Sequence, residues 1–139
     1  MAHNPYAQYK KMEVTTNDPV KLVVMLYEGA IVALRRSIDH IKAKQYEAKC
    51  KELMRAHDIL FELLACLDRE KGGEIAKNLE SLYTYMLRRI LEVNMDLDIA
   101  KAEEVIRLLT NINDGWRELA RRNAAGMTEE VPFQIGRAH

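Results

Sequence analysis

Histidine, cysteine and carboxylate side chains are the groups of this chain that could bind a metal or transfer a proton. The four histidines are His3, His40, His57 and His139. Helical bundles that hold two metal ions use inward-pointing Glu-x-x-His pairs, but neither His40 nor His57 has a glutamate three residues earlier. The chain also contains no Cys-x-x-Cys and no His-Glu-x-x-His motif. The sequence therefore predicts no metal, haem or other cofactor.

The carboxylate pairs have the spacing of a solvated helix surface. Asp58 and Glu62 are four residues apart, and so are Glu70 and Glu74. A general acid and a general base need two carboxyl groups with separated pKa values in one cleft, and nothing in the sequence indicates such a cleft. The glycine pair at 72–73 is not a phosphate-binding loop, because no strand precedes it and the Gly-Lys-Ser/Thr sequence is missing. The sequence predicts a protein that is not an enzyme.

Charge and hydropathy exclude several classes of partner. Lys plus Arg and Asp plus Glu both number 21, so no net charge attracts nucleic acid or anionic lipid. The N-terminus has no apolar signal-peptide core, and the longest apolar run, 22–34, is too short to span a bilayer. Cys50 and Cys66 fall on one predicted helix, roughly 24 Å apart, which is too far for a disulfide. We expect a cytoplasmic protein with no nucleic-acid partner and no membrane insertion.

Proline, glycine and aspartate divide the chain into helices. Asn4-Pro5 opens a short segment to about residue 12, and Asp18-Pro19 starts a long helix to about residue 44. Further helices are predicted over about 46–68, 74–94 and 98–123, with a glycine turn at 69–73 and a cap at Asp98. The prediction is an all-α, antiparallel up-down four-helix bundle over residues 18–124. Residues 1–17 would form a short N-terminal helical cap, and residues 125–139 a disordered tail.

Apolar residues at helical spacing predict which side of each helix faces the core. The first helix would bury Leu22, Leu26, Ala30, Ala33 and Ser37. The second would bury Leu53, Ala56, Leu60, Leu63 and Leu67. The third would bury Ile75, Leu79, Leu82, Met86 and Ile90. The fourth carries Ala102, Val105, Leu109, Ile112, Trp116 and Leu119 on one apolar stripe.

The first and third helices carry more apolar residues than a core stripe needs. The excess residues are Val23, Val24, Met25, Ile31 and Val32, and then Tyr83, Tyr85, Leu87 and Leu91. One interpretation is that neighbouring helices and the N-terminal segment cover them. The other is that grooves accept an amphipathic helix of another protein, helped by the adaptable side chains of Met25 and Met86. The N-terminal segment with Tyr6 and Tyr9 would then be a displaceable lid.

Several motifs in order along the chain carry a resemblance to a known family. They are DPVKLVVMLYEGA at 18–30, LDREKGGEIAKNL at 67–79, LYTYMLRRIL at 82–91, IRLL at 106–109 and INDGW at 112–116. Together they resemble the FliS family, the bacterial flagellar secretion chaperones that hold flagellin before export. The resemblance covers about residues 6–123. Gly115 is a mild departure, because alanine is expected there.

The resemblance implies a cytosolic, non-enzymatic chaperone that binds the disordered C-terminal region of flagellin. Such a chaperone prevents premature polymerisation and delivers flagellin to the flagellar type III export apparatus. A component of the export gate and other flagellar regulators are further implied partners. By matching position, Tyr9 belongs to the lid, and the surface beneath it contains Leu22, Met25, Leu26 and Tyr27. Periodicity adds three more expected client contacts: Tyr83, Met86 and Ile112. The alternative is a structural or scaffolding bundle that self-associates weakly through its surplus apolar surface.

Overall fold

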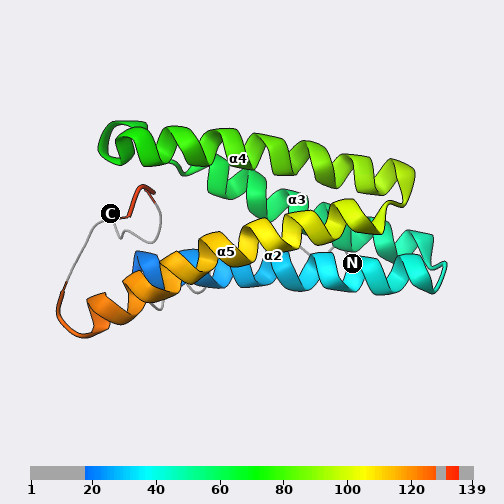
Figure 1. Ribbon diagram of the computed structural model, residues 1–139, viewed down its shortest axis with the longest axis horizontal. Helices are drawn as coiled ribbons and strands as arrows, with labels where there is room; N and C mark the ends of the chain where they lie inside the picture. The colour runs from blue at the N-terminus through cyan, green and yellow to red at the C-terminus, as the bar shows by residue number, and fades with distance from the viewer. Residues whose placement is uncertain (1–17, 128–130, 135–139) are drawn as a thin grey trace.

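The computed structural model describes residues 18–127 and 131–134. They form four long helices: α2 (Pro19–Lys42), α3 (Tyr46–Ala65), α4 (Arg69–Asp96) and α5 (Ile99–Ala124). Helix α2 packs against α3 and α5, and α4 packs against the same two helices, so the four helices form a closed ring (Figure 1). The prediction of an all-α four-helix bundle is confirmed. The predicted cap over residues 1–17 lies outside the described residues.

Aspartates begin three of the four helices. The Asp18 carboxylate accepts hydrogen bonds from the backbone N–H groups of Val20 and Lys21, at 3.1 and 3.2 Å. The Asp98 carboxylate does the same for the N–H of Ala100, at 3.0 Å. These bonds satisfy N–H groups that have no partner inside the helix. The predicted starts of the first and fourth helices are confirmed.

The corner between α3 and α4 differs from the prediction. Helix α4 begins at Arg69, because Asp68 accepts a hydrogen bond from the backbone N–H of Lys71 at 3.0 Å and so caps a first turn. Gly73, with φ 53° and ψ −130°, then interrupts the helix. The prediction of a turn over 69–73 was wrong for that first helical turn. The predicted positive φ at one of the two glycines is confirmed for Gly73, a conformation that favours a residue without Cβ.

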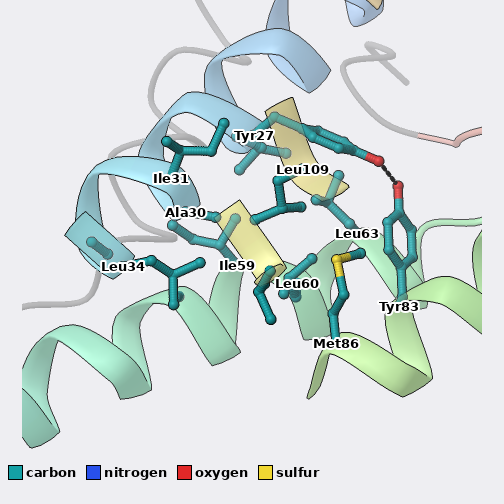
Figure 2. Packing of buried hydrophobic residues seen from close by; sticks show 14 of the residues in the cluster. Tyr27, Ala30, Ile31, Leu34, Ile59, Leu60, Leu63, Tyr83, Met86 and Leu109 are labelled. Carbon is teal, nitrogen blue, oxygen red and sulfur yellow. Dashed lines mark hydrogen bonds between the residues drawn. The ribbon is translucent and has the colours of Figure 1, made fainter. Parts of the chain in front are cut away.

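The core follows the predicted stripes on α2 and α3 and, on α4, includes the predicted members Leu79, Met86 and Ile90. Helix α4 buries Ala76, Leu79, Tyr83, Met86, Ile90 and Val93. These residues are spaced 3-4-3-4-3, whereas the predicted member Ile75 is 59% exposed. The prediction was wrong for Ile75 and for Tyr83, which was assigned to surplus surface. Figure 2 shows why it is inside: its hydroxyl group and that of Tyr27 form a hydrogen bond in the core, so neither polar atom is left unpaired.

Residues 131–134 fold back onto the corner between α3 and α4, near the start of α4 in Figure 1; we call them the strap. The backbone N–H of Asp68 donates to the carbonyl of Pro132 at 3.0 Å, and that of Gln134 donates to the carbonyl of Cys66 at 2.8 Å. Phe133 is 1% exposed and packs edge-on against Trp116, with ring centroids 5.7 Å apart. A disordered tail was predicted here. For these four residues the structure differs, because one buried aromatic ring and two backbone bonds hold them.

Candidate protein-binding surface

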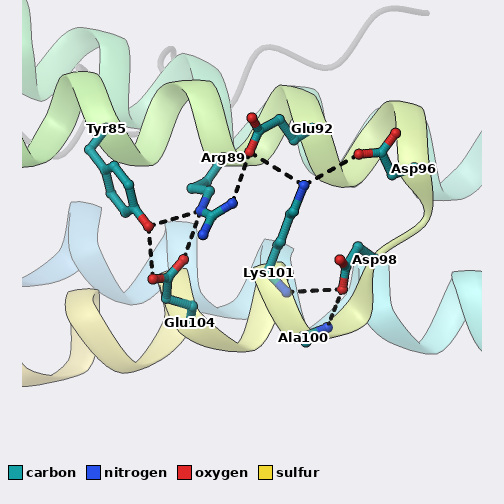
Figure 3. Close-up of polar contacts among 8 residues, drawn as sticks. All are labelled: Tyr85, Arg89, Glu92, Asp96, Asp98, Ala100, Lys101 and Glu104. Atoms are coloured by element: carbon teal, nitrogen blue, oxygen red, sulfur yellow. Dashed lines mark hydrogen bonds and ion pairs between the residues drawn. The ribbon is translucent and has the colours of Figure 1, made fainter.

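Helices α4 and α5 are joined near their connecting loop by charged and polar side chains, which Figure 3 shows. The Arg89 Nε donates to Glu104 at 2.9 Å, and the Tyr85 hydroxyl donates to the same carboxylate at 2.8 Å. Glu92 accepts from Arg89 at 3.1 Å and lies 3.5 Å from the Lys101 ammonium. The hydrogen bond from Arg89 lowers the pKa of the Glu92 carboxyl. This end of the α4–α5 seam is therefore closed by polar contacts.

The other end of the same seam opens into an apolar groove of about 370 Å³. We call it the α4–α5 groove. Its lining residues are Ile75, Leu79, Ile112, Gly115, Trp116, Glu118, Leu119 and Arg122. A side chain at Gly115 would meet no atom within 4 Å, so this residue leaves the groove wide. The groove thus offers apolar side chains to a segment that is not part of the described bundle.

The groove exists because the buried side of α5 changes beyond Leu109. Ala102, Val105 and Leu109 are buried as predicted, but Asn113 takes the next inward position and is 2% exposed. The remaining members of the predicted stripe, Ile112, Trp116 and Leu119, are only half-buried. The helices of the bundle therefore cover the apolar stripe of α5 completely only as far as Leu109. Its last three members line the groove instead.

The predicted client-binding residues of α2 lie mostly in the core. Leu22 and Leu26 are each 1% exposed, and Tyr27 is fully buried. Met25 is half-buried and is the member of this set that a partner could touch without moving the bundle. Tyr6 and Tyr9 lie outside the described residues. As client contacts, all six residues stay a prediction.

Of the three client contacts that periodicity suggested, Ile112 lines the α4–α5 groove. Tyr83 and Met86 are fully buried, so a partner could reach them only if the bundle opened. Burial raises the pKa of Tyr27 to about 12. Burial, followed by the neighbouring Tyr27, also raises the pKa of Tyr83. The two phenols are therefore neutral structural groups at physiological pH.

The sequence analysis missed Ile75 as a groove residue, because it assigned Ile75 to the core. A signal was present: Ala76, Leu79, Tyr83, Met86, Ile90 and Val93 form an unbroken heptad series that leaves Ile75 out. With that series in the core, Ile75 falls one position off the buried side, toward α5. An apolar residue in that place is free to line a groove.

Within the described ranges, 18–127 and 131–134, no cluster of three or more His, Cys, Asp or Glu side chains could hold a metal ion. Cys50 and Cys66 are not joined by a disulfide in the described part of the chain, and the Cys66 thiol donates to the Glu62 carboxylate at 3.2 Å. No helix in this part of the chain is long and apolar enough to cross a membrane.

The sequence of the chain is similar to those of a known protein family. The family model described as flagellar protein FliS matches residues 2–123. The flagellar secretion chaperone FliS of Salmonella typhimurium is 41% identical over 117 residues, which cover 83% of this chain and 87% of the relative. The Vibrio cholerae protein of the same name is 34% identical, covering 80% of this chain and 85% of the relative. The Bacillus subtilis protein of that name is 31% identical, covering 83% and 85%.

Proposed function

The chain belongs to the FliS family of flagellar secretion chaperones, and on that premise we propose that its client is flagellin. It binds the disordered C-terminal region of flagellin, prevents premature polymerisation and delivers the client to the flagellar type III export apparatus. It acts in the cytoplasm, by binding alone and without catalysis. A component of the export gate and other flagellar regulators are the further partners of this function.

The α4–α5 groove is the observation that supports a binding role most directly. A disordered segment that folds on binding loses conformational entropy, so it must bury a large apolar area in return. Ile75, Ile112 and Leu119 offer such area beside Trp116 without any opening of the core. Grooves of this kind accept an amphipathic helix whose apolar residues are spaced i, i+3, i+4 and i+7.

The surface around Met25 is the second part of the proposed client site. Met25 is half-buried on α2, and methionine adapts to differently shaped partners because its side chain is unbranched and flexible. In this proposal the N-terminal segment with Tyr6 and Tyr9 covers that surface before the client binds. The client then displaces the segment.

Calorimetric titration with the C-terminal segment of flagellin from the same source tests the proposal. We expect saturable one-to-one binding with a negative heat-capacity change, the mark of buried apolar surface. The Ile75→Asp variant should bind more weakly, because a carboxylate in the groove loses hydration. Phe61→Asp is the matched control, since Phe61 lies on α3 and is 58% exposed against 59% for Ile75.

Two results would count against this function. Equal affinities of Ile75→Asp and Phe61→Asp would remove the α4–α5 groove from the client site. No binding by the unmodified protein, with a sedimentation coefficient that rises with concentration, would favour the self-associating scaffold. The exposed Phe61 and Met95, at 58% and 74%, are the residues that such self-association would use.

A further inference from the structure

Asn113 is a buried amide with an unsatisfied polar atom. It lies on α5, is 2% exposed, and its Oδ1 accepts no hydrogen bond in the described part of the chain. The orientation of an amide is assigned from its hydrogen bonds, and the orientation in the structure leaves Oδ1 without a donor. A buried polar atom without a partner destabilises the folded state. The free protein therefore keeps an unfavourable amide that a partner from outside could satisfy.

This amide lines a surface cleft of about 330 Å³ between α2 and α5, which we call the Asn113 cleft. Its other lining residues are Glu28, Ile31, Val32, Arg35, Thr110, Asp114 and Arg117. An ion pair between Arg117 and Glu28, at 3.1 Å, joins the two helices at the cleft. Val32 is 41% exposed and supplies an apolar wall. The volume is enough for one or two side chains of a partner.

The charges of the Asn113 cleft favour a neutral ligand group. Glu28 and Asp114 balance Arg35 and Arg117, so the cleft has no excess charge for an anion or a cation. A charged ligand group would meet both signs of charge in the cleft, so neither an ammonium nor a carboxylate group gains a net attraction that offsets its lost hydration. A hydroxyl or carboxamide group is better suited, because it both donates and accepts and so fits either orientation of Asn113.

We propose that the Asn113 cleft is a polar anchor for the flagellin segment. The segment places a Ser, Thr, Asn or Gln side chain against the Asn113 amide and an apolar side chain against Val32. This inference rests on the proposed function and adds a determinant of specificity to it. Because the α4–α5 groove and the Asn113 cleft flank α5 on two sides, a segment that fills both wraps around this helix.

An anchor of this kind selects between client segments. A segment with an apolar residue at the anchor position gains no hydrogen bond from the Asn113 amide, so it binds more weakly than a segment with a hydroxyl or carboxamide group there. The amide then serves recognition at the expense of the stability of the free chaperone. A substitution that stabilises the free protein should accordingly weaken client binding.

The test compares Asn113→Leu with Asn111→Leu. Leucine has the same branching and number of side-chain heavy atoms as asparagine but has no polar atom, and Asn111 is an exposed residue of the same helix. We expect Asn113→Leu to raise the Tm by several degrees, because a buried unsatisfied amide is removed. In calorimetric titration it should bind the flagellin segment about tenfold more weakly or worse. Asn111→Leu should change neither value.

Other outcomes would overturn the inference. Equal affinity of Asn113→Leu and the unmodified protein would mean that the client does not satisfy the amide. A lower Tm of Asn113→Leu would mean that the amide already has a stabilising partner in the free protein. If the unmodified protein fails to bind the segment, the proposed function fails as well, whereas the first two outcomes leave that function standing.

Discussion

The hydroxyl group of Tyr27 on α2 is hydrogen-bonded to that of Tyr83 on α4, across the diagonal of the bundle. The backbones of these two helices do not pack against each other, since each packs against α3 and α5 instead. The ring centroids are 6.3 Å apart, and both residues are fully buried. The bond thus links opposite helices through the core. It also fixes their relative register, because a shift of either helix would leave two buried hydroxyl groups unpaired.

We predict strong non-additivity between Tyr27→Phe and Tyr83→Phe. Each single variant leaves the remaining buried hydroxyl group without its hydrogen-bond partner and should lower the free energy of unfolding by about 1–3 kcal/mol. The double variant removes both hydroxyl groups, so it should lose much less than the sum of the single losses. Urea unfolding of the four proteins in the cycle measures this. Additive losses would show that the two hydroxyl groups do not depend on each other.

The same pair predicts a loss of stability at alkaline pH. Tyrosines of the unfolded chain ionise near their ordinary pKa of 10.0, while burial raises the pKa of Tyr27 to about 12. Between these two pKa values the folded state binds more protons than the unfolded state does. The free energy of unfolding therefore keeps its full value below pH 10 and falls as the pH rises through this window. When thermal unfolding is measured across this pH window, the Tm of the unmodified protein should fall more steeply with pH than the Tm of the double phenylalanine variant. Parallel curves would contradict the prediction.

The Phe133→Ala variant tests the strap. Phe133 is 1% exposed and contacts Trp116, so we expect the free energy of unfolding to fall by roughly 3 kcal/mol. Met127→Ala is the control, because Met127 is 52% exposed and its loss should change little. Denaturant unfolding monitored by circular dichroism gives both values. Similar small effects for the two variants would mean that the strap is not held in solution.

The loss of stability at acidic pH should depend on Asp68. Its carboxylate accepts hydrogen bonds from the Lys71 backbone and from the Gln134 side chain, and these bonds lower its pKa below the ordinary 3.8. The contribution of the Asp68 carboxylate to the free energy of unfolding is fully present above pH 3.8. It is lost as the pH falls through the lower pKa of the folded state. Asp68→Asn keeps a good cap without the charge. Unfolding at a series of acidic pH values should show a flatter dependence for this variant.

Met25→Asp should abolish binding of the flagellin segment and leave the bundle folded. Met25 is half-buried, and a carboxylate at an apolar contact loses hydration when the client covers it. Titration gives the affinity, and circular dichroism checks the helices. Loss of the helical signal would place Met25 among the residues that hold the core, and would remove it from the client site.

Helix positions and most of the core follow from local rules. Asp18-Pro19 and Asp98 act as caps as the sequence predicts, because capping depends on residues within one helical turn. The stripes of α2 and α3 are also confirmed. The boundary of α4 was missed since Asp68 can both follow one helix and cap the next. Sequence periodicity alone does not decide between these roles.

The candidate site depends on contacts between distant residues, which periodicity does not contain. Burial of Tyr83 requires Tyr27, 56 positions earlier, to pair with its hydroxyl group. Docking of the strap requires Trp116 and the backbone of residues 66–68 to meet Phe133. An inward Asn113 is contrary to the usual preference for apolar core residues. Departures from local rules are expected at functional or strained sites, so the inward Asn113 on α5 is itself informative.

Trp116 gives the protein an optical reporter of its own. It is the single tryptophan of the chain, and its ring contacts Tyr27 on α2 and Phe133 in the strap while it lines the α4–α5 groove. The emission maximum and the intensity of indole fluorescence depend on the polarity around the ring. Release of the strap and filling of the groove would alter that polarity in opposite directions. Stopped-flow emission could therefore follow the two events in time, with no dye attached.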